Sequence, residues 1–357
     1  MGENSIIVVK GSLKEYAWGK VNGLQEWSEK TDQAQAELWF GDHPSGKSID
    51  KSTNKVLETN SSFPLLIKLL CAGEPLSIQV HPDKQTAENG FADFEDNVKL
   101  LSDDNEKDEM LFALEEFHAF AGIKNKIDRD QVFKELYENS KLSELKEVLG
   151  TDTFFDAADI IFEIEKSKIT MLNKLIVEVL KKNNYSIQET MAFQKIVDKY
   201  PHDPGVLVCI LMQFHVLKRG DAIHVSPGTP HSYVKGLAVE IMTTSDNVLR
   251  MGLTDKYVNI DAALSIVREK QIQVMSLDTS DGVHIYKPEA NYELVVIDNA
   301  TYQNRNTTFA GILNLEGQTK IIDGTSEISL AKGETALISN LDVKVEVKGH
   351  AVVARCV

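Results

Sequence analysis

Apolar and polar positions alternate over much of the chain, and one alternating stretch places three polar side chains together. Residues 76–81 combine β-branched with polar positions and end before a proline, which predicts a strand. Because successive side chains of a strand point to opposite faces, Ser77, Gln79 and His81 share one face. This face lines a cavity if the apolar face packs on a core. An exposed face of an antiparallel sheet explains the pattern equally well.

Two neighbouring strands carry charges. The strand predicted over residues 64–72 holds Lys68 within an apolar run. We expect its ammonium group to reach solvent, the commoner arrangement, and a polar cavity that the group faces is the alternative. The strand predicted over residues 110–114 follows Glu109. A solvated turn is the favoured interpretation of this carboxylate, and an inward-facing ligand is the alternative.

Aromatic and glycine residues cluster at residues 16–19 and 36–44, which is typical of packed corners in an all-β domain. Trp18 in the first cluster could instead wall a ligand site. The sequence favours packing.

The period changes to that of a helix between residues 127 and 200. Apolar residues recur there three and four positions apart, and few Gly or Pro residues interrupt them. We predict a helical insertion domain over residues 127–205. Residues 1–126 and 206–262 then form one discontinuous jelly roll.

The β pattern returns after the insertion. Strands are predicted over residues 207–216 and 222–225, and a Pro- and Gly-rich loop then leads to His231 and a strand over residues 237–242. This order is typical of a cupin-type jelly roll, whose barrel holds a metal on inward-facing strand residues. An empty barrel would have the same composition.

Residues 283–357 alternate again, and we predict a small C-terminal jelly roll over residues 263–357 with a structural His350. Turns are expected at residues 316–317, 323–324, 332–333 and 348–349. The fold class predicted is therefore mainly β with an α-helical insertion: two cupin-like jelly-roll barrels plus a helical domain.

Composition excludes several classes of protein. The 357 residues are too many for one core and predict two or three domains. A net charge of −16 argues against nucleic acid or an anionic membrane as a partner. We expect no membrane span and no secretory signal. Three widely spaced cysteines favour reduced thiols and a cytoplasmic location.

Four candidate metal ligands could meet in this arrangement. Gln79 and His81 share a strand face, Glu109 opens another strand and His231 follows a proline-bearing turn. Two imidazoles, a carboxylate and an amide oxygen suit a borderline divalent ion, most simply zinc, with a position left for water or substrate. No C-x-x-C or H-E-x-x-H motif supports the set, so the pattern alone is weak evidence.

The segment Pro75-Leu76-Ser77-Ile78-Gln79-Val80-His81-Pro82 resembles the signature of the type I mannose-6-phosphate isomerase (phosphomannose isomerase) family. The resemblance covers most of the predicted β portion in the expected order. It extends through residues 16–19, 36–39, 63–72, 220–222, 230–233 and 245–257. The helical insertion and the C-terminal unit match by position rather than by motif.

The resemblance implies a zinc-dependent aldose–ketose isomerase that interconverts D-mannose 6-phosphate and D-fructose 6-phosphate through an enediol. It implies one zinc ion per chain, held by Gln79, His81, Glu109 and His231. Its matching positions give a catalytic set of Arg250, Asp246, Lys107 and Glu240, and a substrate-binding set of Ser77, Lys68, Lys256 and Trp18.

Roles within these sets follow from the chemistry. The base is Asp246, Glu240, Lys107 or a metal-bound hydroxide, and the sequence does not decide among them. Arg250 and Lys256 suit the phosphate, which cationic side chains bind best.

One loop departs from the family. Where its members usually have His-Lys-Pro-Glu, this chain has Glu106-Lys107-Asp108-Glu109. The lysine and the glutamate are kept, but Glu106 replaces the histidine, which weakens any mechanism that needs an imidazole there.

Two other classes are weighed. A non-catalytic sugar-phosphate-binding cupin is disfavoured because the polar set is intact. A cupin oxygenase with Fe(II) is disfavoured because a Gln/His/Glu/His set beside cationic residues suits zinc and a sugar phosphate better. We expect a monomer whose partner is a small-molecule sugar phosphate.

Overall fold

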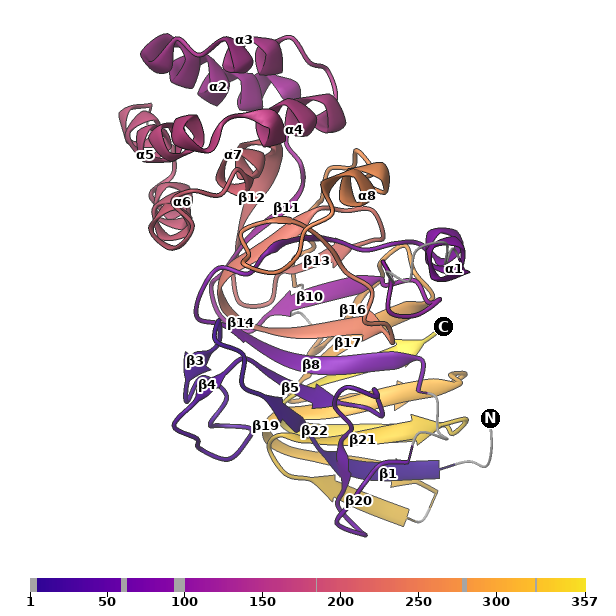
Figure 1. The fold of residues 1–357 in the computed structure, drawn as a ribbon. Coiled ribbons are helices and arrows are strands. Elements are labelled where there is room, and N and C mark those ends of the chain that lie inside the picture. The colour runs from indigo at the N-terminus through magenta and orange to yellow at the C-terminus, as the bar shows by residue number, and fades with distance from the viewer. Residues whose placement is uncertain (1–4, 59–62, 93–99, 184, 278–280, 325) are drawn as a thin grey trace.

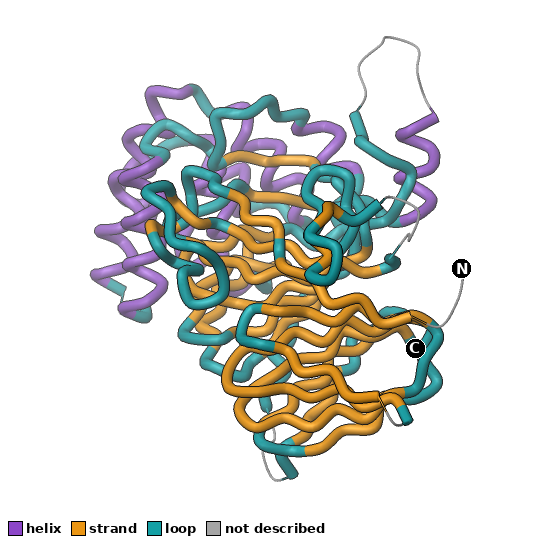
Figure 2. The backbone as a smooth tube through the Cα atoms, turned by 90° about the horizontal axis from the view of Figure 1, so that it is seen from below, coloured by secondary structure: helices purple, strands orange, loops and turns teal. Residues whose placement is uncertain are grey.

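The computed structural model describes residues 5–58, 63–92, 100–183, 185–277, 281–324 and 326–357. Two strand-rich regions are stacked on each other, and helices cover the end of the first (Figure 1). Seen from below, most of the helices gather on one side of the strands (Figure 2). The predicted fold class, mainly β with a helical insertion, is confirmed.

The first region is a curled ten-stranded sheet built around one long strand. That strand, β14 (His231–Thr243), follows the helical insertion in the sequence, but the four strands that pair with it all precede the insertion. The other members are β2 (Ser12–Lys14), β5 (Glu37–Phe40), β8 (Leu65–Ala72), β9 (Ile78–Val80), β10 (Glu109–Ala113), β11 (Phe117–Ile123), β12 (Met212–Leu217), β13 (Ala222–Val225) and β15 (Leu249–Gly252). Segments that are distant in sequence therefore share one barrel wall, while the exact domain boundaries stay a prediction.

Alternation along β8 gives the two faces of the strand different neighbours. Ile67 and Leu69 pack into a cluster with residues of the second sheet, whereas Leu70 belongs to a cluster inside the barrel. Lys68, between them, faces inward with Leu70. The exterior cluster joins the two sheets, so the barrel wall that carries the site is supported from behind.

The second sheet also has ten strands. Its C-terminal members are β16 (Val283–Tyr286), β17 (Tyr292–Asp298), β18 (Thr301–Asn304), β19 (Phe309–Asp323), β20 (Ser326–Leu330), β21 (Glu334–Ser339) and β22 (Val343–Cys356). The N-terminal strand β1 (Ser5–Lys10) pairs with β21, and β6 (Ile49–Asp50) and β7 (Lys55–Val56) continue the same sheet. The first residues thus lie with the C-terminal unit, outside the barrel to which the sequence assigned them. A separate two-stranded piece pairs β3 (Lys20–Val21) with β4 (Ala34–Gln35).

Two of the four predicted turns are wrong. Gly317 and Gly349 lie within β19 and β22 and pair with each other, beside a register shift between Asn314 and Glu316. Both glycines have positive φ angles, 73° and 128°. A glycine that suits a turn suits a β-bulge for the same reason, so the sequence pattern did not distinguish them.

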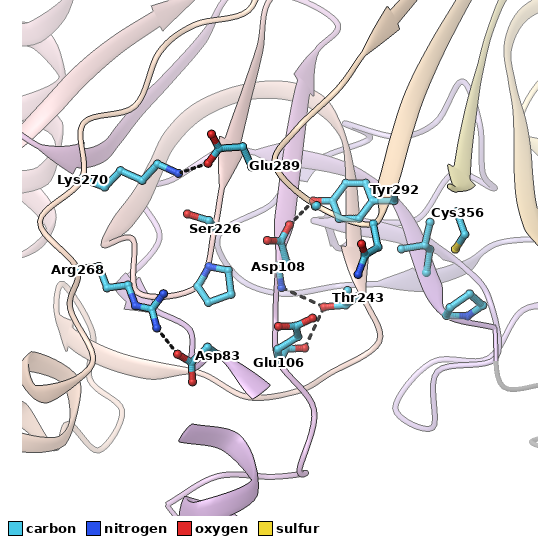
Figure 3. Close-up of a pocket in the computed structure, with 15 residues that line it drawn as sticks. Asp83, Glu106, Asp108, Ser226, Thr243, Arg268, Lys270, Glu289, Tyr292 and Cys356 are labelled. Carbon is cyan, nitrogen blue, oxygen red and sulfur yellow. Dashed lines mark hydrogen bonds and ion pairs between the residues drawn. The ribbon is translucent and has the colours of Figure 1, made fainter. Parts of the chain in front are cut away.

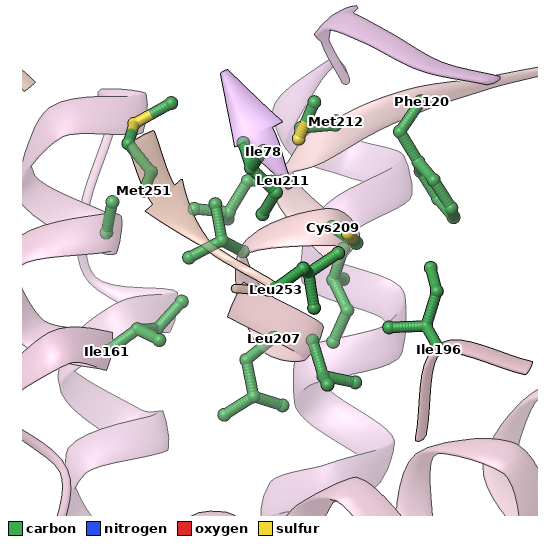
Figure 4. Packing of buried hydrophobic residues seen from close by; sticks show 14 of the residues in the cluster. Ile78, Phe120, Ile161, Ile196, Leu207, Cys209, Leu211, Met212, Met251 and Leu253 are labelled. Atoms are coloured by element: carbon green, nitrogen blue, oxygen red, sulfur yellow. The ribbon is translucent and has the colours of Figure 1, made fainter. Parts of the chain in front are cut away.

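The helical insertion comprises α2 (Lys126–Ser140), α3 (Ser143–Leu149), α4 (Phe154–Glu163), α5 (Lys166–Lys182) and α6 (Ile187–Lys199). Side chains of Asn125, Thr153 and Ser186 cap three of these helices by accepting a backbone N–H. The helices pack on the barrel through an apolar cluster, part of which is shown in Figure 4. In this cluster Phe120 of β11 contacts Phe193 of α6. Helices outside the insertion include α1 (Lys84–Ala92) and α8 (Ile260–Ser265). Every helix in the described part of the chain is too short or too polar to cross a bilayer.

The strand predicted over residues 207–216 is half wrong. Residues 205–211 form a short α-helix, α7 (Gly205–Val208), and one 3₁₀ turn, and only β12 is extended. Leu207, Cys209 and Leu211 are buried in the cluster between helices and barrel. A run that is apolar on every side fits a buried helix as well as a buried strand, and periodicity does not separate the two.

A close contact between the two sheets yields a stability prediction. A Cβ atom at Gly311 of β19 would overlap Cδ1 of Ile67 in β8. Gly311→Ala should lower the free energy of unfolding by about 1–3 kcal/mol through overpacking. Ile67→Val removes the clashing carbon at a cost of about 0.5–1.5 kcal/mol.

In urea unfolding, the double variant should therefore lose less stability than the sum of the two single losses. Strict additivity would show that the sheets do not meet at this pair.

Candidate metal centre

Three of the four predicted ligands come together inside the barrel. His81 follows β9, while Glu109 and His231 are the first residues of β10 and β14. All three are buried, and their candidate ligand atoms lie within 4.8 Å of one another. The Nε2 atoms of His81 and His231 each lie 3.4 Å from a different oxygen of Glu109. The interpretation of Glu109 as a solvated turn is wrong, because it is 2% exposed.

Backbone carbonyls fix the orientation of both imidazoles. Nδ1 of His81 lies 2.8 Å from the carbonyl oxygen of Asn247, and Nδ1 of His231 lies 3.1 Å from that of Thr229. A carbonyl oxygen only accepts, so each Nδ1 carries the hydrogen and each Nε2 presents a lone pair. Within the described residues, the buried Nε2 of His81 has no hydrogen-bond partner. An unpaired buried nitrogen is costly, and a metal ion would satisfy it.

The charges of the cluster suit a cation. Burial, aided by Lys107, lowers the pKa of His81 to about 3, and burial also lowers the pKa of His231. Both rings are therefore neutral, the form that binds metals. Burial alone would raise the pKa of Glu109, but the ammonium group of Lys107 holds it well below its usual range. Lys107 Nζ lies 2.9 Å from Glu109 Oε1.

Gln79, the fourth predicted ligand, lies on β9 between two other predicted site residues. It pairs with His231 of β14 on one side and with Arg250 of β15 on the other. This register puts the amide beside the cluster. It also places Arg250 one strand away from the candidate ligands.

A buried ion-pair network forms the adjoining wall. Lys68 Nζ lies 2.8 Å from Glu240 Oε2 and 3.9 Å from Glu37 Oε1, and it sits 5.1 Å from the ring centre of Trp39. The indole N–H of Trp39 donates to Glu37 at 2.9 Å. The expectation that Lys68 reaches solvent is wrong, because these partners lie on strands that the local sequence does not reveal.

The charges of this network shift the pKa values of its own side chains. Burial lowers the pKa of Lys68, but the carboxylates of Glu240 and Glu37 more than offset this, so Lys68 stays charged. Burial raises the pKa of Glu240 to about 7, and Lys68 opposes that rise. A carboxyl group with such a pKa is a plausible acid or base near neutrality.

The remaining predicted residues lie around this interior. Asp246 follows β14 and is partly exposed, and its carboxylate accepts a hydrogen bond from Ser45 at 2.8 Å. Arg250 is half-buried. Partial burial of Lys256 and the neighbouring charge of Arg250 lower the pKa of Lys256. Ser77 is half-buried just before β9. Trp18 packs against the apolar cluster inside the barrel, the role that the sequence favoured.

The loop that departs from the family alternates between two environments. Lys107 and Glu109 face the imidazoles, whereas Glu106 and Asp108 line a separate cavity of about 600 Å³ between the barrel and the second sheet (Figure 3). Asp108 accepts hydrogen bonds from Tyr292 of β17 and from His224 Nε2, the latter at 2.9 Å. Glu106 therefore does not replace a histidine within the cluster, and the second sheet anchors the loop.

Sequence reasoning missed two members of the site. Glu37 and His43 fall inside the segment interpreted as a packed aromatic corner, yet Glu37 contacts Lys68, and His43 Nε2 lies 3.5 Å from Asp246 Oδ1. A usable signal was present, because His43-Pro44 repeats the His81-Pro82 pair.

Fold and site together define a class: a cupin-type jelly-roll protein with a buried His/Glu/His donor set of the kind that holds a catalytic metal. A sequence model described as "Phosphomannose isomerase type I, catalytic domain" matches residues 6–126. The "Mannose-6-phosphate isomerase 1" of Arabidopsis thaliana is 30% identical over 72% of this chain and 70% of its own. The mannose-6-phosphate isomerase of Escherichia coli K12 is 29% identical over 96% of this chain and 97% of its own.

Solved structures agree. A mutant phosphomannose isomerase from Salmonella typhimurium superposes with a TM-score of 0.84 at 25% identity, covering 99% of this chain and all of that one. A zinc-bound mannose 6-phosphate isomerase has the same fold, with a TM-score of 0.83 at 24% identity over 99% of both chains. The chain belongs to the type I phosphomannose isomerase family, a family of enzymes.

The buried network makes a testable prediction. Lys68→Met leaves two buried carboxylates without their cation, so it should lower the free energy of unfolding by about 3–5 kcal/mol. Glu240→Gln should cost less, because Glu37 still neutralises Lys68. Urea unfolding at pH 8, where Glu240 is ionised in the wild type, measures both.

Adding Glu240→Gln to Lys68→Met should recover part of the loss. If the double variant is no more stable than Lys68→Met, the two groups do not interact as described.

Proposed function

We propose that the protein interconverts D-mannose 6-phosphate and D-fructose 6-phosphate, with one zinc ion held by Gln79, His81, Glu109 and His231. The observation that carries this proposal is the buried cluster in which the Nε2 atoms of two imidazoles and the Glu109 carboxylate converge, with Nε2 of His81 left without a hydrogen-bond partner among the described residues. Family membership supports the substrate and the reaction. The zinc-bound relative supports the choice of metal.

The metal would supply a Lewis acid that stabilises negative charge on the substrate oxygens as an enediol forms. The chain itself must move a proton between C1 and C2. Glu240 and Lys107 are engaged in buried ion pairs, whereas Asp246 is partly exposed beside the interior. We therefore assign the base to Asp246, with Lys68 and Lys107 balancing the buried carboxylates.

Positive charge must also compensate for the net charge of −16. Arg250 lies beside Gln79. Lys256 lies near Arg250, because partial burial and then the charge of Arg250 lower the pKa of Lys256. These two side chains are proposed to bind the phosphate, with help from Ser77, and Trp18 to line the sugar site. The predicted monomeric state and cytoplasmic location stay predictions.

An assay that couples fructose 6-phosphate formation to a reporter enzyme tests the function itself. Within it, His231→Ala should lower bound zinc and turnover together, because it removes one of the lone pairs. His202→Ala is the matched control, since His202 is exposed on the helical part and bonds Thr170. It should keep both metal and turnover. Normal turnover and full zinc content in His231→Ala would refute the ligand assignment.

The phosphate site is tested by substrate choice. Arg250→Ala should lower kcat/KM for mannose 6-phosphate about tenfold to a hundredfold, because a charge-assisted hydrogen bond contributes roughly 1.5–3 kcal/mol. Unphosphorylated mannose should be affected much less. Arg305→Ala is the control, at an exposed arginine in the loop just after β18. Equal losses for both substrates would mean that Arg250 positions the sugar or the fold instead.

A further inference from the structure

The imidazole of His43 is buried against the partly exposed carboxylate of Asp246. The side chain of His43 is 3% exposed and that of Asp246 is 44% exposed, and 3.5 Å separates Nε2 from Oδ1. The other oxygen, Oδ2, accepts the Ser45 hydroxyl at 2.8 Å. One short loop between β5 and β6 thus meets both oxygens of Asp246.

The hydrogen bonds of the His43 ring show which of its two nitrogens carries the hydrogen. The backbone N–H of Ser45 donates to Nδ1 of His43 at 3.2 Å, so Nδ1 has no hydrogen of its own in the neutral ring. The hydrogen is then on Nε2 and points toward Asp246. Burial lowers the pKa of His43, with Asp246 opposing, which favours this neutral form.

The loop that carries His43 is held rigidly. The imidazole ring of His43 packs edge-on against Trp39, with 5.1 Å between ring centres. The ammonium group of Lys14 lies 4.7 Å from the ring centre of Trp39. Lys14 also donates to the carbonyl oxygen of Ser45. At the base of the loop, Ser48 donates to the carbonyl of Trp39 at 3.1 Å. A donor on such a support can hold a carboxylate in one orientation.

We propose that His43 is a positioning residue for the isomerisation: its Nε2–H holds the Asp246 carboxylate in the orientation that accepts the substrate proton. The inference rests on the proposed function and on Asp246 as the base. It also places an imidazole in the machinery of a chain whose loop has Glu106 where its family usually has histidine. Other charges that face His43 are Lys68, Asp103 and Lys107.

Two amide substitutions separate this role from a purely structural one. His43→Asn keeps an acceptor where Nδ1 receives the Ser45 N–H, but it loses the donor that reaches Asp246. His43→Gln extends an amide N–H to the position of Nε2 and gives up the Nδ1 acceptor. If His43 positions Asp246, His43→Asn should lower kcat about tenfold to a hundredfold with little change in KM, and His43→Gln should retain more activity.

If His43 only holds its own loop, the order reverses, with His43→Gln the more impaired, and that result overturns the proposal. Thermal unfolding of both variants shows whether a loss of kcat comes from a loss of fold. His202→Asn, at the exposed histidine of the helical part, should match the wild type in every measurement.

A double-mutant cycle tests whether His43 acts through Asp246. In an Asp246→Asn background, adding His43→Asn should change kcat by less than about threefold, because the orientation of the base no longer matters. An undiminished effect in that background overturns the proposal. A wild type that is active while His43→Asn keeps full kcat overturns this inference alone. A wild type without isomerase activity overturns the proposed function and the inference with it.

Discussion

A buried carboxylate is the constraint on which the rest of the site depends. Glu109 lies inside the barrel, where an unbalanced charge would be costly, so it requires partners on every side. Lys107 supplies one, and the two Nε2 lone pairs beside it call for a cation to complete the arrangement. Backbone carbonyls hold both imidazoles in that orientation. The arrangement of these three side chains therefore suits a metal ion.

The fold supplies this geometry through one strand. β14 begins with His231 and carries Glu240 nine residues later, and it pairs with the strands that bear Lys68 and Glu109. The wall thus places a metal-type cluster and a charged network side by side on the barrel interior. Behind it, apolar residues of the same strands pack against the second sheet. Asp108 adds a polar link, because Tyr292 of that sheet bonds to it. The C-terminal unit carries no candidate ligand, but it supports the loop that does.

The features that could be predicted from the sequence followed from the local periodicity of apolar and polar positions. Alternation alone put Gln79 and His81 on one strand face, and the change of period located the helical insertion. Burial of Glu109 and Lys68 could not be predicted locally, because Lys68 and its partner Glu240 are 172 positions apart. The predictions of a strand at residues 207–211 and of a turn at Gly317 were wrong for a different reason. An apolar run fits a buried helix or a buried strand, and a glycine fits a turn or a β-bulge. The roles of the site residues came from the family resemblance.

The central claim is that this cluster binds one zinc ion on which isomerisation depends. The most direct measurement is a titration: protein stripped of metal by a chelator receives zinc in small steps, and mannose 6-phosphate turnover is followed alongside bound metal. The account predicts almost no turnover in the stripped protein and a linear rise that ends at one zinc per chain. Full turnover by protein that retains no metal would contradict it.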